Sequence, residues 1–380
     1  MSQTNAHRIY LDNNASTPID PKVAAVMQEA IASDFGNPSS NHWAGAPAHA
    51  IVERARQQVA NLLGCSPQEI IFTSGGSESN NLALKGLYYA CRNPSAHIIT
   101  TQVEHPAIIE PCRFLEQLGA RITWLPVDST GRVNPDDLRR SITSDTILIS
   151  IMHANNEVGT IQPIEECSRI AREDSVPIHT DAAQSIGKLP TRVEDLGVDL
   201  LTIAGHKLYA PKGVGALYVR NGVAVEPFIH GAGHESGRRA GTESALLTAA
   251  LGEACELASD LSTVADIEAL RDRFWLALQE ALGDRVVLNG HPDERLPNTL
   301  NVSFVGHVGA NVLQAMPEVA ASTGSACHAD RVDLSPVLKA MGVSAEVGAG
   351  AIRFSLGRTT TAQEIDTVAK RLIHYLQHLD

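Results

Sequence analysis

Short apolar runs alternate with amphipathic stretches through the middle of the chain. Seven of these runs have the length and composition of strands: Glu69–Thr73, His97–Thr101, Arg121–Val127, Thr146–His153, Pro177–Thr180, Leu200–Ala204 and Gly215–Val219. Helical spacing of apolar residues predicts helices between several of them, at Asn80–Cys91, Ala107–Leu118 and Ile164–Arg172. Strands that alternate with helices and are apolar on both faces indicate a mainly parallel α/β sheet.

The C-terminal part of the chain has a different pattern. Two longer helical patterns run from about Ser244 to roughly Leu282. Strands are then expected at Val286–Asn289, Asn298–Val305 and Ala351–Leu356, and helices near Ala310–Met316 and at Ala362–Leu376. This mixture indicates a smaller α+β domain. We therefore expect an α/β protein with a large domain built on a mainly parallel seven-stranded sheet (residues 12–258) and a small α+β domain (residues 1–11 and 259–380).

The composition limits the partners and the location that can be expected. The 380 residues are 43% hydrophobic and carry a net charge of -13, which gives no electrostatic reason to expect a nucleic acid or an anionic membrane as partner. No run approaches the roughly 20 apolar residues of a spanning helix, and the start of the chain is polar. We expect a cytoplasmic protein whose six cysteines are separate thiols, because their spacing is neither C-x-x-C nor zinc-like.

Five of the expected strands are followed by polar residues that can bind a ligand or carry chemistry. These are the turn Thr73–Asn81, His105, Asn156, Asp181 and Lys207. Ligands bind at the carboxyl ends of the strands in α/β sheets, so these residues are candidates for one site. A glycine turn before a helix presents N–H groups and the positive end of a helix dipole, which suit a phosphate. An acid that ends a buried strand needs a cationic or donor partner.

The lysine and the histidine give this candidate site its chemistry. Lys207 follows a buried strand, so it can be partly desolvated with a lowered pKa, as Schiff-base chemistry requires. His105 could stack on a flat cofactor and move protons. Each feature also has an ordinary explanation: a helix cap, a turn aspartate, a solvated lysine and a loop histidine. Their occurrence at five strand ends of one sheet favours a site that binds pyridoxal phosphate and acts on an amino acid.

Several stretches together resemble the cysteine desulfurase and selenocysteine lyase family, of the class V aminotransferase fold, along nearly the whole chain. The matching stretches are Tyr10–Ala15, Gly36–Ser40, Phe72–Asn81, Val103–His105, His153–Gly159, His179–Gln184, Gly205–Lys207, Arg239–Thr242, Gly324–Cys327 and Arg353–Arg358. The resemblance implies the type I fold of pyridoxal phosphate-dependent transferases.

The resemblance also implies roles for residues around the cofactor ring. Lys207 would form the Schiff base with pyridoxal phosphate and then shuttle the Cα proton of the substrate. Asp181 would pair with the pyridinium nitrogen, and His105 would stack on the ring and assist proton transfer. Gln184 would bond the ring hydroxyl oxygen.

Phosphate and substrate contacts are implied in the same way. The residues that would bind the phosphate are Gly76, Ser77, His206 and, from the neighbouring subunit of a homodimer, Thr242. Arg353 would clamp the substrate carboxylate in a bidentate pair, with Asn156 beside it and in contact with the cofactor. One position departs from many relatives: Ala204 stands where they have a serine that bonds the phosphate, a difference of about 1 kcal/mol.

Cys327 decides which reaction is expected. It lies in Ser322–Asp330, a run of small and polar residues that indicates an exposed loop, and His328 could favour its thiolate form. The resemblance implies that this thiolate attacks the sulfur of L-cysteine, which leaves a persulfide on Cys327 and releases L-alanine. The long segment from Ala326 to Ser335 is similar to that of desulfurases which pass sulfur directly to a protein acceptor, such as an iron–sulfur scaffold or a thiolation carrier.

Three other functions stay open at this point. Selenocysteine lyase is the nearest, because L-selenocysteine differs from L-cysteine by one atom and the stretches Val193–Asp199 and Ala326–His328 look like that branch. An aminotransferase or decarboxylating enzyme of the same fold would not need the loop cysteine, and a silent scaffold protein would not need Lys207. His230 and His234 have a spacing that metal sites use, but the flanking glycines argue against the helix such a pair needs. No metal is expected.

Overall fold

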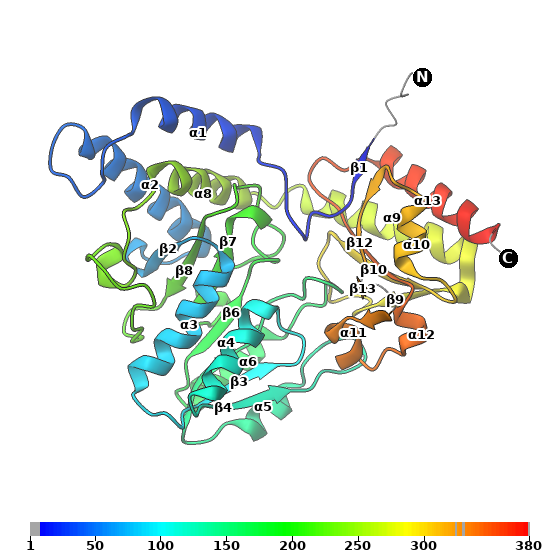
Figure 1. The fold of residues 1–380 in the computed structure, drawn as a ribbon, viewed down its shortest axis with the longest axis horizontal. Helices are drawn as coiled ribbons and strands as arrows, with labels where there is room; N and C mark the ends of the chain where they lie inside the picture. The colour runs from blue at the N-terminus through cyan, green and yellow to red at the C-terminus, as the bar shows by residue number, and fades with distance from the viewer. Residues whose placement is uncertain (1–7, 324, 329–330, 379–380) are drawn as a thin grey trace.

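Two main sheets, which lie side by side, organise the molecule (Figure 1). The computed structural model describes residues 8–323, 325–328 and 331–378, without the side chains of residues 33, 325–328 and 331–333. The larger sheet has seven strands in the order β2-β8-β7-β6-β5-β3-β4. Its strands are β2 (Ile70–Thr73), β3 (His97–Thr101), β4 (Arg121–Leu125), β5 (Thr146–Ser150), β6 (Ile178–Asp181), β7 (Leu200–Ala204) and β8 (Gly215–Val219).

The larger sheet is mainly parallel, as the sequence predicted. Only β8 runs antiparallel to its two neighbours, β2 and β7, while the other pairs are parallel. All seven expected strands are present. The runs Arg121–Val127 and Thr146–His153 were expected to be longer than β4 and β5, which end at Leu125 and Ser150. Ile151 and His153 nevertheless continue to donate backbone hydrogen bonds to the strand beside them.

Helices cover both faces of the larger sheet. Helices α3 and α4 pack on one face, and α2, α5, α6, α7 and α8 pack on the other. The helices of this part are α1 (Pro21–Ser33), α2 (Gly45–Leu63), α3 (Gly76–Cys91), α4 (Pro106–Gln117), α5 (Pro135–Ser141), α6 (Ile164–Glu173), α7 (Val193–Leu196) and α8 (Ala245–Ala258). Because both faces are buried, the strands read as continuous apolar runs rather than as an alternation of apolar and polar residues.

The smaller sheet is antiparallel and has the strand order β12-β15-β10-β9. Its strands are β9 (Val286–Asn289), β10 (Thr299–Phe304), β12 (Ser322–Thr323) and β15 (Ala351–Ser355). The helices of this part are α9 (Val264–Leu282), α10 (Gly309–Gln314), α11 (Pro336–Ala340), α12 (Ala345–Gly348) and α13 (Ala362–Gln377). Phe274 of α9 meets Phe354 of β15 edge to face, with ring centroids 5.0 Å apart. This aromatic pair lies in a second hydrophobic core, separate from the core of the larger sheet.

The N-terminal segment joins the smaller part before it enters the larger one. Strand β1 (Ile9–Tyr10) pairs in parallel with β11 (Val319–Ala320). The domain boundaries proposed from the sequence, 12–258 against 1–11 with 259–380, stay a prediction. Within the described part of the chain, no helix is long and apolar enough to cross a membrane. The cysteines whose side chains are described are all free: Cys65, Cys91, Cys112, Cys167 and Cys255.

The segment around Cys327 forms a hairpin rather than the open loop that the sequence indicated. Strand β13 (Ser325–His328) pairs antiparallel with β14 (Arg331–Leu334), and the backbone of Cys327 lies opposite Val332. The expectation of a loop was therefore wrong for Ser325–His328. A run of small and polar residues shows no clear alternation, so its sequence carries little strand signal. The side chain of Cys327 lies outside the described part of the structure.

Candidate active site

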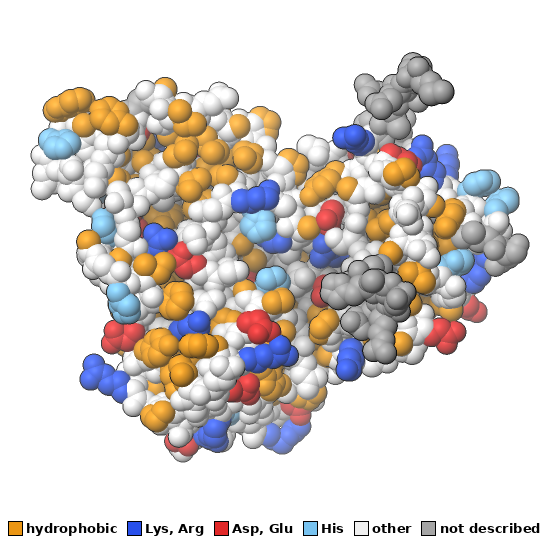
Figure 2. Space-filling model, viewed as in Figure 1, with side chains coloured by type: hydrophobic (Ala, Val, Ile, Leu, Met, Phe, Trp, Pro, Cys, Tyr) orange, Lys and Arg blue, Asp and Glu red, His pale blue; other side chains and the backbone are white. Residues whose placement is uncertain are grey.

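A cavity of about 560 Å³ lies where β6 and β7 of the larger sheet end. Nine of the eleven site residues expected from the sequence line it: Gly76, Ser77, His105, Asn156, Asp181, Gln184, His206, Lys207 and Arg353. Figure 2 shows the hollow between the two parts of the molecule in which it opens. Thr242 is exposed and does not line the cavity, and the side chain of Cys327 is not described. The structure therefore brings together residues from both sheets.

Lys207 ends a short 3-10 turn (Gly205–Lys207) that follows β7. Its ammonium donates hydrogen bonds to the main-chain carbonyls of Asn14, at 2.6 Å, and Ala15, at 2.9 Å. Burial lowers the pKa of Lys207 to about 8, and repulsion from Arg353 acts in the same direction. The lowered pKa expected from the sequence is confirmed. A fraction of the amine, larger than for an ordinary lysine, is thus neutral and nucleophilic near physiological pH.

Asp181 is the last residue of β6, and two donors fix its carboxylate. One oxygen accepts from the side-chain amide of Asn80 at 2.7 Å, and the other accepts from the N–H of Ala183 at 2.9 Å. The residue is 6% exposed, yet it lines the cavity. A carboxylate held in this way keeps unused lone pairs for a cationic N–H group that enters the cavity.

The two histidines of the cavity are both biased toward the neutral form. His105 caps the start of α4, and its Nδ1 accepts from the N–H of Ala107 at 3.1 Å. This contact leaves Nε2 as the ring nitrogen that can exchange a proton with a ligand. Burial lowers the pKa of His105, with Asp181 opposing the shift and Lys207 adding to it. Burial, and then repulsion from Lys207, lowers the pKa of His206 to about 4.

The glycine turn after β2 positions the start of α3 against the end of β7. Gly75 has φ +148°, a conformation open essentially only to glycine. A Cβ atom at Gly76 would lie only 3.1 Å from the Cβ of Ala204, so the two elements pack closely. Helix α3 begins at Gly76, four residues earlier than the helix expected from Asn80. The first N–H groups of α3 consequently face the cavity, where they can bind an anion.

An ion pair between Glu78 and Arg239 holds the glycine turn after β2 in place. The carboxylate of Glu78 accepts from Arg239 Nε at 2.8 Å and from the N–H of Ser74 at 2.7 Å. Burial alone would raise the pKa of Glu78, but these hydrogen bonds outweigh it and lower the pKa. Arg239 belongs to the segment that also carries Thr242.

Asn14 is a site residue to which the sequence gave no role. It is 1% exposed, and its main-chain carbonyl accepts from both Lys207 and Gln184. Its side chain donates to Thr299 Oγ1 at 2.8 Å and to the carbonyl of Asn156 at 3.2 Å. It therefore contacts residues of both sheets. In the sequence, Asn14 is included only in the matching stretch Tyr10–Ala15. No local pattern gives it a role, because its partners are far away in the sequence.

Gln184 keeps one polar atom for a ligand. Its Nε2 donates to the carbonyl of Asn14 at 3.0 Å. Its Oε1 is buried and has no hydrogen-bond partner among the described residues. A buried carbonyl oxygen of this kind is destabilising unless a donor reaches it, so a hydroxyl of a bound group would fit there.

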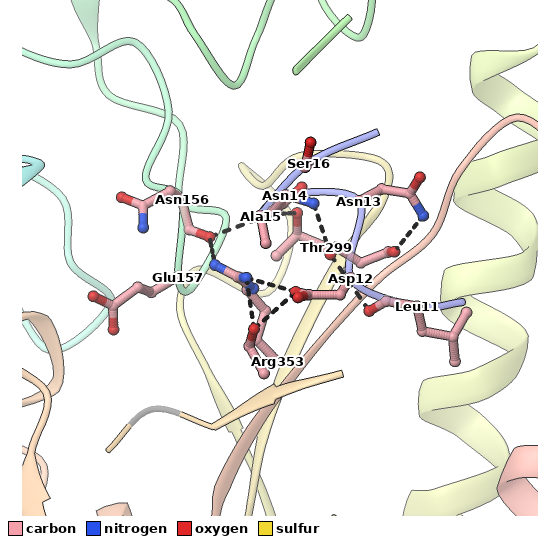
Figure 3. Close-up of polar contacts among 12 residues, drawn as sticks. Leu11, Asp12, Asn13, Asn14, Ala15, Ser16, Asn156, Glu157, Thr299 and Arg353 are labelled. Atoms are coloured by element: carbon pink, nitrogen blue, oxygen red, sulfur yellow. Dashed lines mark hydrogen bonds and ion pairs between the residues drawn. The ribbon is translucent and has the colours of Figure 1, made fainter. Parts of the chain in front are cut away.

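Arg353 of β15 brings a cation from the smaller sheet into the cavity (Figure 3). Its Nη1 donates to the main-chain carbonyl of Asn156 at 2.8 Å. Its Nη2 donates to Asp12 Oδ1 at 2.7 Å and to Ser322 Oγ at 3.0 Å. The residue is 8% exposed. The site thus has an amine on the larger sheet and a guanidinium on the smaller one.

Known proteins place this arrangement among the class-V aminotransferases, since the model of the family "Aminotransferase class-V" matches residues 9–368. The cysteine desulfurase IscS of Dictyoglomus turgidum is 47% identical over 377 residues, which cover 97% of this chain and 95% of that protein. The chain belongs to the cysteine desulfurases of this family. Its fold, predicted from the sequence, is confirmed by a solved NifS-like protein with a TM-score of 0.91 and 38% identity, covering 97% of this chain and 99% of the other. The solved structure "SspA in complex with cysteine" has a TM-score of 0.83 and 37% identity, covering 93% and 100%.

Proposed function

We propose that this desulfurase holds pyridoxal phosphate in the cavity, moves the sulfur of L-cysteine to Cys327 and releases L-alanine. The observation that carries the proposal is the convergence of Lys207, Asp181 and Arg353 on one cavity. These residues supply a partly neutral amine, a fixed carboxylate and a carboxylate-binding cation. A solved relative in complex with cysteine supports the choice of substrate.

The residues around the cavity fit pyridoxal phosphate. The free N–H groups of Gly76 and Ser77 at the start of α3 suit the phosphate, and the fixed carboxylate of Asp181 suits a protonated ring nitrogen. The unpartnered Oε1 of Gln184 suits the ring hydroxyl. When bound, the cofactor supplies an electron sink that makes the α-proton of an amino acid acidic and weakens the bond to its β-substituent.

The protein side of the reaction then consists of binding and proton transfer. Arg353, with Asn156 beside it, holds the substrate carboxylate, and the amine of Lys207 takes the proton from Cα. His105 Nε2 is the group that would hold or return a second proton.

Sulfur transfer needs no outside oxidant. The thiolate of Cys327 forms a bond to the substrate sulfur while the bond between that sulfur and Cβ breaks, and its electron pair stays on the carbon. With two protons returned to carbon, L-cysteine and the Cys327 thiol become L-alanine and a Cys327 persulfide, so atoms and electrons balance.

The persulfide then passes to an acceptor. We place Cys327 in the β13–β14 hairpin, and a hairpin that moves would bring the cysteine to the cavity and then to a partner. The acceptor is a protein thiol, on an iron–sulfur scaffold or a thiolation carrier.

We also propose a homodimer in which Thr242 completes the phosphate site of the neighbouring subunit. Large apolar side chains are exposed at the end formed by α1 and α2: Ile31 at 69%, Phe35 at 81% and Trp43 at 82%. Figure 2 shows apolar side chains gathered over this end. Large apolar side chains that are exposed together, as Phe35 and Trp43 are with ring centroids 6.4 Å apart, are typical of a protein interface. Replacing Trp43 by aspartate is expected to shift the molecular mass in sedimentation from dimer to monomer; an unchanged mass contradicts this placement.

The central experiment is to incubate the protein, loaded with pyridoxal phosphate, with L-cysteine. We expect L-alanine to be released and mass spectrometry to find one added sulfur on Cys327. The Cys327→Ala variant should lose both signals. The Cys91→Ala variant is the control, because Cys91 is a free and partly accessible thiol, and it should keep them. Undiminished alanine release in Cys327→Ala contradicts the sulfur-transfer mechanism, and activity confined to L-selenocysteine contradicts the substrate.

A further inference from the structure

Both edges through which the Arg353 guanidinium could bind a carboxylate share a nitrogen that already has hydrogen-bond partners. A guanidinium offers five N–H donors, and a carboxylate binds in two contacts along one of two edges, Nε with Nη2 or Nη1 with Nη2. Both edges therefore include Nη2. In this structure Nη2 donates to Asp12 Oδ1 at 2.7 Å and to Ser322 Oγ at 3.0 Å. A substrate carboxylate that binds Arg353 through two contacts must therefore compete with these acceptors for Nη2 (Figure 3).

Another donor of the same guanidinium has no partner. The Nε of Arg353 is buried and makes no hydrogen bond within the described part of the chain. A buried charged donor without an acceptor is destabilising. The edge formed by Nε and Nη2 thus has one N–H available and one already taken. A ligand carboxylate would satisfy Nε and compete for Nη2.

Asp12 is the anion that such a ligand meets at Nη2. Its side chain is 20% exposed and that of Arg353 10%, with 2.7 Å between the paired atoms. The Ser322 hydroxyl donates to the same Asp12 oxygen at 2.8 Å, so Asp12 keeps a partner if Arg353 is withdrawn. The other acid near Arg353 is Glu157, whose carboxylate accepts from the Ser335 hydroxyl instead. Asp12 is therefore the carboxylate in direct competition.

We infer that Asp12 is an internal competitor for the carboxylate site of Arg353, and that it sets how tightly the enzyme binds an α-amino acid. The substrate carboxylate takes Nε and Nη2, while Asp12 moves onto Ser322. This inference rests on the proposed role of Arg353 in binding the substrate carboxylate. Asp12 acts through Arg353, so it is a positioning residue rather than a catalytic one.

The test compares two ligands in the cofactor-loaded protein. L-alanine carries the carboxylate, and L-alaninamide has the same size without the charge. Their dissociation constants are measured from the change in cofactor absorbance on titration, a readout that does not require turnover. Asp12→Asn keeps the side-chain volume and removes the competing charge. Ser322→Ala is the matched control, because it removes the other acceptor of Nη2 without removing a charge.

Asp12→Asn should tighten L-alanine binding by about three- to fivefold, the upper part of the range of a partly exposed ion pair, and leave L-alaninamide within about twofold. The KM for L-cysteine should fall while kcat stays the same or falls. Ser322→Ala should change L-alanine binding by less than Asp12→Asn.

Two outcomes overturn the inference. Weaker L-alanine binding in Asp12→Asn means that Asp12 supports Arg353 rather than competing for it. Equal changes for L-alanine and L-alaninamide mean a general distortion of the site. Failure of the proposed function has a different signature: L-cysteine gives no L-alanine in the unaltered protein, while the two ligands still respond differently to Asp12→Asn.

Discussion

The Asn14→Ala substitution removes three hydrogen bonds from a buried side chain that touches both sheets. Asn14 donates to Thr299 and to the carbonyl of Asn156, and it accepts from the side-chain amide of Asn298 at 3.0 Å. Thr299 begins β10 of the smaller sheet, and Asn156 follows β5 of the larger one. The substitution thus weakens the contact between the two parts of the molecule at the edge of the cavity.

The expected loss of stability depends on which hydrogen bonds the partners of Asn14 keep after the substitution. Asn298 also donates to the carbonyl of Leu356, at 3.1 Å, and Thr299 also donates to Asn298. These partners retain a hydrogen bond each, so the larger penalty of a fully unsatisfied group does not apply. Three bonds at about 1 kcal/mol each lower the free energy of unfolding by about 3 kcal/mol.

Urea unfolding followed by circular dichroism measures this loss. The neighbouring Asn13 is a matched control, because it is also buried but its side chain makes one hydrogen bond, to the carbonyl of Ser355 at 2.9 Å. Asn13→Ala should lower the free energy of unfolding by about 1 kcal/mol. Asn14→Ala should also lower turnover of L-cysteine, because the Asn14 carbonyl that holds Lys207 shifts with its residue.

The comparison of the two variants can refute this reasoning. If Asn14→Ala and Asn13→Ala cost the same within about 0.5 kcal/mol, the resolution expected for independent sites, the three contacts of Asn14 do not hold the sheets together. If stability falls as expected but turnover of L-cysteine is unchanged, the position of Lys207 does not depend on Asn14.

Three further predictions follow from the electrostatics of the described residues. The apoprotein should take up pyridoxal phosphate faster as the pH rises from about 6.5 to 8.5. Lys207 must lose a proton to attack an aldehyde, and its pKa is lowered to about 8. An uptake rate that does not change with pH, measured by absorbance, contradicts this. Glu235→Ala removes the buried, 2.7 Å partner of half-buried Arg56, which keeps its ion pair with Glu53. The substitution should lower the free energy of urea unfolding by about 1.5–3 kcal/mol, with a smaller loss for Glu235→Gln; equal losses would show that charge is not the cause. Asp181→Asn should release more cofactor on dialysis while the urea midpoint of the apoprotein stays unchanged, and full retention argues against its contact with the ring nitrogen.

The larger sheet could be predicted because its strands are buried on both faces. Runs such as Leu200–Ala204 are continuous and apolar, so their ends are easy to locate, and the residues that follow them were candidates for the site. Helices α1 and α2 were not predicted. Much of the buried face of α2 is alanine, including Ala48, Ala55 and Ala60, and small residues give a weak periodic signal.

Residues that depend on distant pairing could not be identified in this way. Asp12 and Arg353 are 341 positions apart, and the backbone of Asp12 pairs with Ser355 at the end of β15. No local pattern around Asp12 indicates that partner. The β13–β14 hairpin was missed for a related reason, because its pairing, rather than the propensity of its small residues, makes it a strand.

The separation between the two sheets limits the length of the substrate backbone that fits the cavity. The amine of Lys207 is anchored to one sheet and the guanidinium of Arg353 to the other. In the reaction we propose, the amine of Lys207 takes the proton from Cα while Arg353 holds the carboxylate on the adjacent carbon, so the two groups can act together only at one separation. A β-amino acid, longer by one methylene, would have to push the sheets apart against the buried contacts of Asn14. The fold would then select substrates by the length of their backbone, independently of the residues that contact the substrate side chain.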